Sequence, residues 1–257
     1  MTAHPFDAAA PDYDAVFTNQ LLGQWLRQIV RDHVTFIPNS HILELGCGTG
    51  EDALWLASQG LQVTATDASL EMLSITAHKA AKVGIDTVST RQLNLNYPDP
   101  LPDTYDGVFT NFGVVNCVKD RTALAEYLAE HMHTDGKIIF VVMGPICPWE
   151  ILIHIAQGDF KGATRRFRNN ESAHVGDGEF IEVWYPSPSQ LIGEFAPTFK
   201  HIRTVGVGTL LPPSYMAHWV ERWPKLFARF ETIDRHLGGY FPLTYLNDHY
   251  LVEFKRR

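Results

Sequence analysis

The sequence predicts an α/β fold in three layers, with helices on both faces of a mostly parallel sheet. Apolar, strand-like segments alternate with amphipathic helical segments through the first half of the chain, and this alternation is typical of a parallel sheet covered on both sides. A turn with three glycines follows the first strand. The alternation breaks after Met143, which predicts an insertion before the sheet is completed.

The first half of the chain contains most of the expected elements. A helix is expected over residues 19–34, where apolar residues recur at helical spacing. Strands are expected at residues 41–45, 61–67, 86–95, 105–111 and 136–143, with helices between them at 52–58, 69–83 and 121–131.

The second half predicts a lid and the rest of the sheet. Residues 144–184 are punctuated by Gly and Pro and include the basic segment FKGATRRFRNN, so we expect an irregular lid insertion. A helix capped by Ser187 or Ser189 should follow. The remaining elements are a strand at 199–208, a mostly helical excursion at 212–238 and the last strand, DHYLVEFKRR.

The composition limits the class of protein. The chain has 257 residues, of which 45% are hydrophobic, enough for a substantial core. Its formal net charge of −8 disfavours a nucleic-acid or anionic-membrane binder, because those partners attract positive surfaces. Three cysteines without C-x-x-C spacing indicate neither a disulfide framework nor a metal site. The cysteine usage favours a reducing, cytoplasmic setting. Since no apolar run reaches the roughly 18 residues of a membrane span, we also expect a soluble protein.

The stretch ILELGCGTGEDALWLA places Gly46, Gly48 and Gly50 between a strand and a helix. Glycines leave the N–H groups at a helix N-terminus open to a close ligand, so a nucleoside-like cofactor fits there. The dinucleotide fingerprint needs glycine where Glu51 stands, which disfavours pyrophosphate and an NAD-type oxidoreductase. Glu44, near the end of the strand, would attract a cation. The alternative is a tight connection without a ligand.

Asp67 ends the second strand, 21 positions after Gly46. A carboxylate at that distance accepts hydrogen bonds from ribose hydroxyls. Together, LELGCGTG, ATDAS, LNL and YDGVFTNFGVVN resemble the successive motifs of class I S-adenosylmethionine-dependent methyltransferases, over residues 6–143. The resemblance implies a Rossmann-like methyltransferase sheet with an antiparallel last strand, S-adenosylmethionine as cofactor and S-adenosylhomocysteine as its product.

The resemblance also implies how the chain is divided. We expect a single methyltransferase domain over residues 1–257. Its parts are a helical cap at 1–40, a cofactor-binding core at 41–143, the lid at 144–184 and the C-terminal half of the sheet at 185–257.

Cofactor contacts are implied residue by residue. Asn94, or Asn96, would meet the adenine, and Glu44 would lie near the ammonium group or order the glycine turn. Met72 has a second interpretation as helix core, and Tyr13 as surface packing. The expected cofactor-binding residues are Tyr13, Glu44, Gly46, Cys47, Gly48, Gly50, Asp67, Ala68, Met72, Asn94, Leu95, Asn111, Phe112 and Gly113.

Only residues in the second half of the chain indicate what kind of molecule accepts the methyl group. Four basic residues between Lys161 and Arg168 suit an anionic group, or else form a salt-bridged surface. Aromatic residues in the same half suit a flat acceptor. The catalytic candidates are Arg166 and His174, the latter as a base for a hydroxyl acceptor. His249 is expected within the last strand.

We therefore expect methyl transfer to a small organic acceptor, O- or N-directed and aromatic or anionic in character, as in a biosynthetic reaction. We expect neither nucleic acid, nor a membrane span, nor a metal. Two other classes stay open: a non-catalytic S-adenosylmethionine-binding regulatory module and an NAD-type oxidoreductase. The oligomeric state is not addressed by the sequence.

Overall fold

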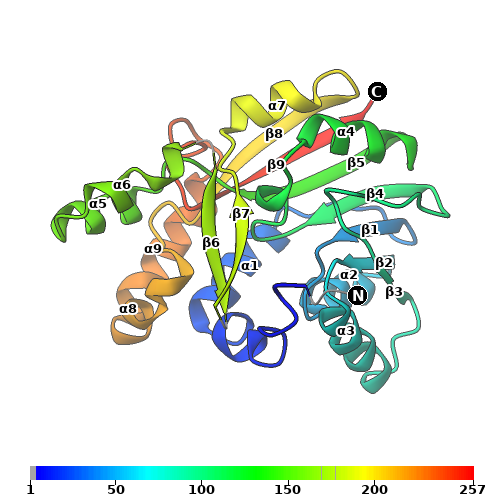
Figure 1. Cartoon of the computed structure of the whole chain (residues 1–257), viewed down its shortest axis with the longest axis horizontal. Helices are drawn as coiled ribbons and strands as arrows, with labels where there is room; N and C mark the ends of the chain where they lie inside the picture. Colours follow the sequence, from blue (N-terminus) through cyan, green and yellow to red (C-terminus); the bar gives the residue numbers. More distant parts are fainter. Residues whose placement is uncertain (1–3, 169, 177) are drawn as a thin grey trace.

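The computed structural model describes residues 4–168, 170–176 and 178–257. At its centre lies a seven-stranded sheet in the order β3-β2-β1-β4-β5-β9-β8 (Figure 1). Strand β9 is antiparallel to both of its neighbours, whereas the pairs from β3 to β5 are parallel. The predicted fold class is therefore confirmed. The strands of this sheet are β1 His41–Leu45, β2 Gln62–Asp67, β3 Val88–Gln92, β4 Tyr105–Thr110, β5 Met132–Met143, β8 Phe199–Val207 and β9 His249–Arg256.

Helices cover both faces of the sheet (Figure 1). Each face has its own buried core: Leu26 and Phe227 belong to one, and Leu124 and Phe195 to the other. Burial of side chains of this size contributes about 1.5–3 kcal/mol each. One face carries α1 Leu21–Arg31, α2 Glu51–Ser58, α3 Leu70–Lys82, α8 Ala217–Arg222 and α9 Pro224–Leu237, and the other carries α4 Arg121–Glu130 and α7 Pro188–Phe195.

Side-chain caps set the starts of α3 and α7. The Ser69 hydroxyl accepts the Met72 N–H at the start of α3. Of the two serines predicted to cap α7, Ser187 is the cap, and its Oγ accepts the Gln190 N–H at 3.2 Å. Because α3 begins directly after β2, this cap places its first turn beside the end of that strand.

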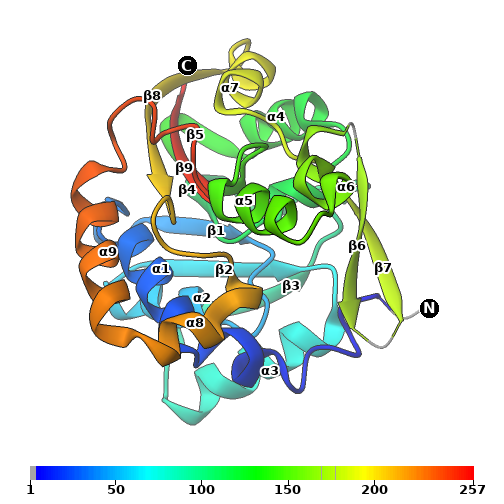
Figure 2. The same cartoon turned by 90° about the vertical axis from the view of Figure 1, so that its left-hand side faces the viewer.

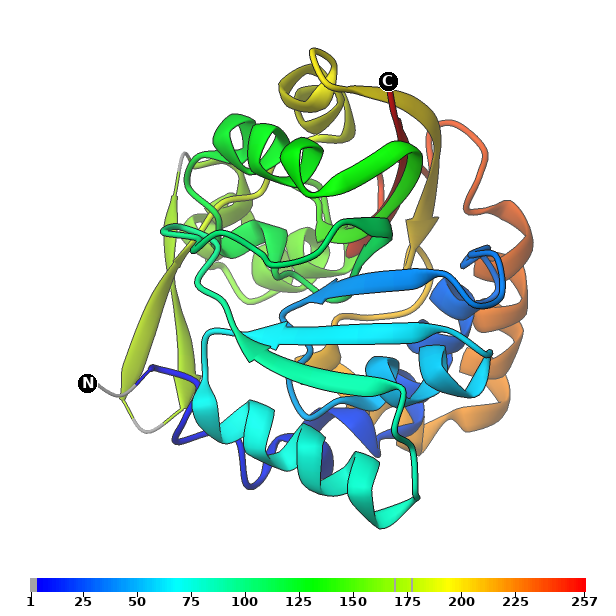
Figure 3. The ribbon, with the colours of Figure 1, turned by 90° about the vertical axis from the view of Figure 1, so that its right-hand side faces the viewer.

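The segment after β5 is more regular than the sequence predicts. It contains α5 Pro148–Ala156, α6 Phe160–Ala163, a turn of 3-10 helix at Arg165–Phe167, and a hairpin of β6 Glu171–Gly176 and β7 Glu179–Val183. The expectation of an irregular segment is wrong because Pro148 occupies the first turn of α5, where its missing N–H costs nothing. Figures 2 and 3 show the hairpin reaching from the side of α6 to the N-terminal segment.

No helix in the described ranges is both long enough and apolar enough to cross a membrane.

Candidate active site

The glycine turn after β1 is tied to the end of β2. The Gly48 N–H donates to Asp67 Oδ2 at 2.9 Å. Gly48 has a φ of +54°, and a Cβ at this position would meet nothing nearer than the Tyr13 ring at 3.9 Å. A Cβ at Gly50 would instead lie 2.7 Å from the Thr76 side chain. Gly48 therefore faces open space, whereas Gly50 lets α3 pack closely against the turn.

Asp67 keeps part of its hydrogen-bonding capacity free. Its Oδ1 accepts the Ser69 N–H and its Oδ2 accepts the Gly48 N–H, both at 2.9 Å. A carboxylate offers about four lone-pair positions, so about two are left for a ligand. Burial raises the pKa of Asp67, while the two N–H groups act in the opposite direction. This arrangement fits the ribose hydroxyls that the resemblance implies.

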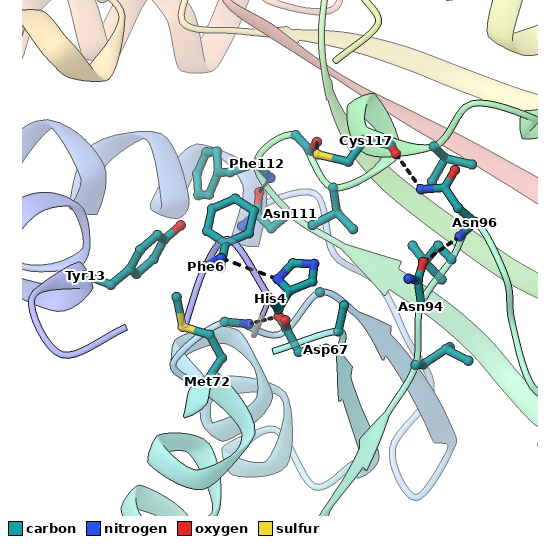
Figure 4. Close-up of a pocket in the computed structure, with 18 residues that line it drawn as sticks. His4, Phe6, Tyr13, Asp67, Met72, Asn94, Asn96, Asn111, Phe112 and Cys117 are labelled. Carbon is teal, nitrogen blue, oxygen red and sulfur yellow. Dashed lines mark hydrogen bonds between the residues drawn. The ribbon is translucent and has the colours of Figure 1, made fainter. Parts of the chain in front are cut away.

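A cavity of about 170 Å³ lies over Asp67 (Figure 4). Asn94 and Asn96 both line it, but the Asn96 side chain is bonded to the Cys117 carbonyl and the Lys119 N–H. Asn94 Oδ1 accepts the Asn96 N–H at 3.0 Å, but its Nδ2 has no partner among the described residues, so Asn94 is the better placed of the two to meet a ligand. The predicted residues that line the cavity are Tyr13, Gly46, Gly48, Asp67, Ala68, Met72, Asn94, Leu95, Asn111, Phe112 and Gly113.

Three predicted residues, Glu44, Cys47 and Gly50, are not among those that line this cavity. Glu44 is only 3% exposed, and burial and the charge of Asp52 raise the pKa of its carboxyl well above the usual range. Burial likewise raises the pKa of the Cys47 thiol, which favours an inert thiol over a reactive one. Glu44 and Cys47 instead tie the turn to β2, since the Glu44 carbonyl accepts the Thr66 hydroxyl at 2.7 Å and the Cys47 N–H donates to the Thr66 carbonyl at 2.8 Å.

The loop after β4 is fixed by a buried ionic cluster. The Asn111 amide donates to Asp52 Oδ2 at 2.9 Å, and Asp52 is paired with Arg27 and Arg31. Phe112 has a φ of +49°, which is uncommon for a residue with a side chain. The Arg27 guanidinium lies 5.2 Å from the Phe112 ring centre. The cluster therefore holds both residues against the cavity.

Asn116 links this loop to the insertion. Its Oδ1 accepts the Met143 N–H at 2.8 Å, and its Nδ2 donates to the carbonyls of Met143 and Trp184 at 2.9 and 2.6 Å. These bonds close the loop after β4 and tie it to the end of β5 and to Trp184.

The N-terminal segment, residues 4–19, crosses the cavity, and we call it the strap. Asp7 accepts the Ser69 hydroxyl at 2.6 Å, and Asp14 accepts the Thr49 hydroxyl at 2.6 Å. The sequence predicted a helical cap over 1–40, but Tyr13 was the one strap residue expected to contact the cofactor, because His4 and Phe6 match no motif and meet the cavity only through the tertiary fold. The strap residues that line the cavity are His4, Phe6 and Tyr13.

A second cavity, of about 870 Å³, adjoins the first, and we call it the chamber. Phe6, Tyr13 and Phe112 line both cavities, so their rings form a shared wall. Further walls come from the strap, the hairpin β6–β7, α8 and the start of β9. The two cavities therefore lie side by side and are separated by aromatic rings.

Buried charges form part of the chamber wall. Arg165 holds Glu150 with two bonds, at 2.6 and 2.8 Å. Arg166 is 5% exposed, and it bonds both Glu150, at 2.9 Å, and Asp248, at 2.6 Å. The guanidinium of Arg166 makes five hydrogen bonds to protein acceptors in all. Arg166 therefore has no donor left for a ligand.

The other residues predicted to meet an acceptor are more exposed. Lys161 and Arg168 lie on the surface, and Arg168 pairs with Glu171 at 2.6 Å. His174 is exposed on β6, where its ring accepts the Gly178 N–H at 3.2 Å, although it also lines the chamber. The basic cluster of the sequence is thus divided between the chamber wall and the outer surface.

Comparison with known sequences points to one family. Residues 42–136 match the family model described as a methyltransferase domain. A demethylmenaquinone methyltransferase of Mycolicibacterium paratuberculosis is 31% identical over 202 residues, covering 76% of this chain and 83% of that protein. One from Renibacterium salmoninarum is 29% identical over 187 residues, covering 70% of this chain and 75% of that protein.

Solved structures share the fold at low identity. The CcbJ methyltransferase from Streptomyces caelestis is 14% identical with a TM-score of 0.64, over 99% of this chain and 98% of that chain. Haemonchus contortus phosphoethanolamine N-methyltransferase 2, solved with S-adenosyl-L-methionine, is 15% identical with a TM-score of 0.59, over 97% of this chain and 56% of that chain. With the glycine turn, Asp67 and the relatives above, the chain belongs to the class I S-adenosylmethionine-dependent methyltransferases.

Proposed function

We propose that this methyltransferase acts on a small, flat acceptor that carries an acidic hydroxyl group, such as a hydroquinone. The observation that carries the proposal is the chamber, which adjoins the cavity over Asp67 across the rings of Phe6, Tyr13 and Phe112. We assign S-adenosylmethionine to the cavity over Asp67 and call it the cofactor cavity. Its volume of about 870 Å³ falls within the roughly 300–1,000 Å³ of small-molecule sites. These features favour a small acceptor over a macromolecular surface.

For the accepting atom, the sequence led us to expect oxygen or nitrogen, and we now add carbon. The relatives above are named for demethylmenaquinone, and one from Geotalea daltonii is named a C-methyltransferase. A deprotonated hydroxyl on an aromatic ring makes both the oxygen and the adjacent ring carbon nucleophilic. We therefore place the ring carbon first and the hydroxyl oxygen second, and a nitrogen acceptor is an alternative outcome of the test.

When bound, S-adenosylmethionine supplies a methyl group on a positively charged sulfur, which becomes a neutral thioether on transfer. The chain has to align the acceptor and exclude water, and alignment alone lowers a barrier by about 7–11 kcal/mol in favourable cases. In this proposal Asp67 binds the ribose, and the rings of Tyr13 and Phe112 cover the junction of the two cavities. Residues 144–184 act as the lid, since Arg165 and His174 from that segment line the chamber.

The experiment supplies purified enzyme with S-adenosylmethionine and a panel of acceptors: reduced naphthoquinones, phenols and primary amines. Mass spectrometry and NMR then identify the methylated atom. Transfer to hydroxylated rings is expected. Turnover of amines alone would contradict the proposal, as would no turnover by a protein that still binds S-adenosylhomocysteine. Binding itself is checked by thermal unfolding, because a ligand at 100 times its Kd stabilises by about 2.7 kcal/mol.

A further inference from the structure

His249, the first residue of β9, lines the chamber beside a buried carboxylate. Its Nδ1 lies 3.0 Å from Asp248 Oδ2. Nδ1 is buried and makes no aligned hydrogen bond within the described part of the chain, and catalytic hydrogen bonds are often poorly aligned before substrate binds. A turn of the ring that brought Nδ1 into line with Asp248 would hold the proton on Nδ1. The lone pair of Nε2 is then free.

Asp248 is itself held from the other side. Arg166 donates to its Oδ1 at 2.6 Å and to its backbone carbonyl at 3.1 Å. Burial alone would raise the pKa of Asp248, but the imidazole of His249, when protonated, and the guanidinium of Arg166 outweigh it and hold that pKa below the usual range. Asp248 therefore stays ionised and cannot turn away from the imidazole without losing a buried ion pair.

His249 also touches the wall that the two cavities share. Its ring packs edge-on against Phe112, with the ring centres 5.4 Å apart. An acceptor resting on Phe112 near the cofactor cavity thus lies beside the imidazole. By contrast, His174 and His218 also line the chamber but are exposed, and neither has a carboxylate within 4.0 Å among the described residues.

The geometry points to His249 as the general base of methyl transfer, with Asp248 as its positioning residue. This inference rests on the proposed function, because it requires an acceptor with an acidic O–H. Nε2 takes the hydroxyl proton, and the O–H electron pair stays on the acceptor. The acceptor then bonds the methyl carbon while the C–S pair returns to sulfur, and the imidazolium passes its proton to water. On transfer to carbon, the ring carbon later releases its own proton and the oxygen regains one, so one proton leaves overall.

Other ionisable groups face the same chamber and bear on any pH profile. Burial raises the pKa of the hydroxyls of Tyr13 and Tyr215, so neither titrates near neutral pH. His174 and His218 also line the chamber, so the pH profile of the wild type must be compared with those of the single variants. The charged side chains around the chamber are those of Asp12, Arg165, Arg166, Glu221 and Asp248.

The kinetic test compares His249→Gln with His174→Gln and His218→Gln. His201→Gln on β8 is the matched control, because His201 bonds Thr204 and is not among the residues lining either cavity. With a hydroxylated acceptor, His249→Gln should lower kcat about 10²- to 10⁴-fold and abolish the fall of kcat on the acid side. Its affinity for S-adenosylhomocysteine, measured by calorimetry, should match that of the wild type. Asp248→Asn should also lower kcat, while Asp248→Glu should recover part of it.

Two outcomes separate this inference from the proposed function. Wild-type turnover of hydroxylated rings with unchanged kcat in His249→Gln, or loss of kcat in His174→Gln instead, would overturn the base assignment alone. No turnover of any hydroxylated ring by the wild type would overturn the proposed function and the inference together.

A measurement without turnover tests the same geometry. NMR of ¹⁵N-labelled histidine rings reports which nitrogen carries the proton, and the His249 signals are assigned by their loss in His249→Gln. The wild type should carry its proton on Nδ1 at neutral pH, and Asp248→Asn should lose that preference. A wild-type ring protonated on Nε2 alone would overturn the inference, because the lone pair would then face Asp248.

Discussion

The cofactor cavity and the chamber share three aromatic rings but are assembled from different kinds of contact. Most residues of the cofactor cavity come within a few positions of the carboxyl ends of β1, β2, β3 and β4, where parallel strands bring their loops to one edge. The chamber gathers Tyr13, Arg166, Tyr215 and His249, which lie far apart in the chain.

The two cavities also differ in how their charged side chains are paired. Asp67 in the cofactor cavity accepts hydrogen bonds from two backbone N–H groups. It forms no ion pair with the described residues. At the chamber, Arg165, Arg166 and Asp248 line the wall and Glu150 pairs with both arginines, so two negative charges meet two positive ones. A ligand can therefore complete the first site, while the second is neutralised by the protein itself. Substitutions around the chamber should therefore change stability, whereas substitutions in the cofactor cavity should change ligand binding.

The largest effect is expected from Arg166→Ala, and it should appear in stability. The substitution leaves the buried carboxylates of Glu150 and Asp248 without their shared cation. Breaking a buried pair in this way costs about 3–5 kcal/mol. The free energy of unfolding, measured in urea at neutral pH, should fall by that amount. Arg168→Ala is the control, because its pair with Glu171 is exposed and worth about 0–1 kcal/mol.

The stability difference between the wild type and Arg166→Ala should depend on pH. The pKa of Asp248 is lowered from 3.8 in the folded state, so its pairing contributes stability above that pH and loses it as the pH falls toward the folded value. The gap between wild type and Arg166→Ala should therefore narrow in acid. An equal loss of stability in Arg166→Ala and Arg168→Ala at neutral pH would contradict the burial of this network.

A smaller effect is expected from Asp67→Ala, and it should appear in cofactor binding. Hydrogen bonds to a charged group contribute about 1.5–3 kcal/mol, so the Kd for S-adenosylhomocysteine should rise about 10- to 150-fold. Calorimetry gives the Kd, and circular dichroism checks the fold, since Gly48 and Ser69 lose an acceptor. Asn94→Ala should cost less, because its amide is neutral. Wild-type affinity in Asp67→Ala would show that the ribose assignment is wrong.

These differences explain what the sequence could predict. The fold and the cofactor cavity rest on local patterns, namely a glycine turn after a strand and Asp67 at the end of the next. The group of Glu150, Arg166, Asp248 and His249 has no such pattern, because α5, the 3-10 turn and β9 bring these residues together only in the folded sheet. Sequence spacing therefore identified Arg166 as a candidate without its partners.

The smallest effect is expected at the strap, which borders both cavities. Asp14 accepts the Thr49 hydroxyl at 2.6 Å and pairs with Lys79 on α3. Because this pair is partly exposed, Asp14→Asn should weaken S-adenosylhomocysteine binding by at most about 1 kcal/mol, and unfolding in urea should change little. Asp12→Asn is the matched control, since the Asp12 side chain makes no hydrogen bond or ion pair within the described part of the chain.

Calorimetry on Asp14→Asn and Asp12→Asn tests whether Asp14 holds the strap over the cavity or binds the ligand itself. If the strap only covers the cavity, it should open more often in Asp14→Asn. Affinity for S-adenosylhomocysteine should then fall slightly, the ligand should leave faster, and the strap should be cut more readily in limited proteolysis. Bound S-adenosylhomocysteine should restore protection in the wild type more fully than in Asp14→Asn. A loss of affinity as large as that of Asp67→Ala would mean that Asp14 acts on the ligand directly, and identical behaviour of both strap variants would mean that the contacts of Asp14 with Thr49 and Lys79 do not hold the strap in place.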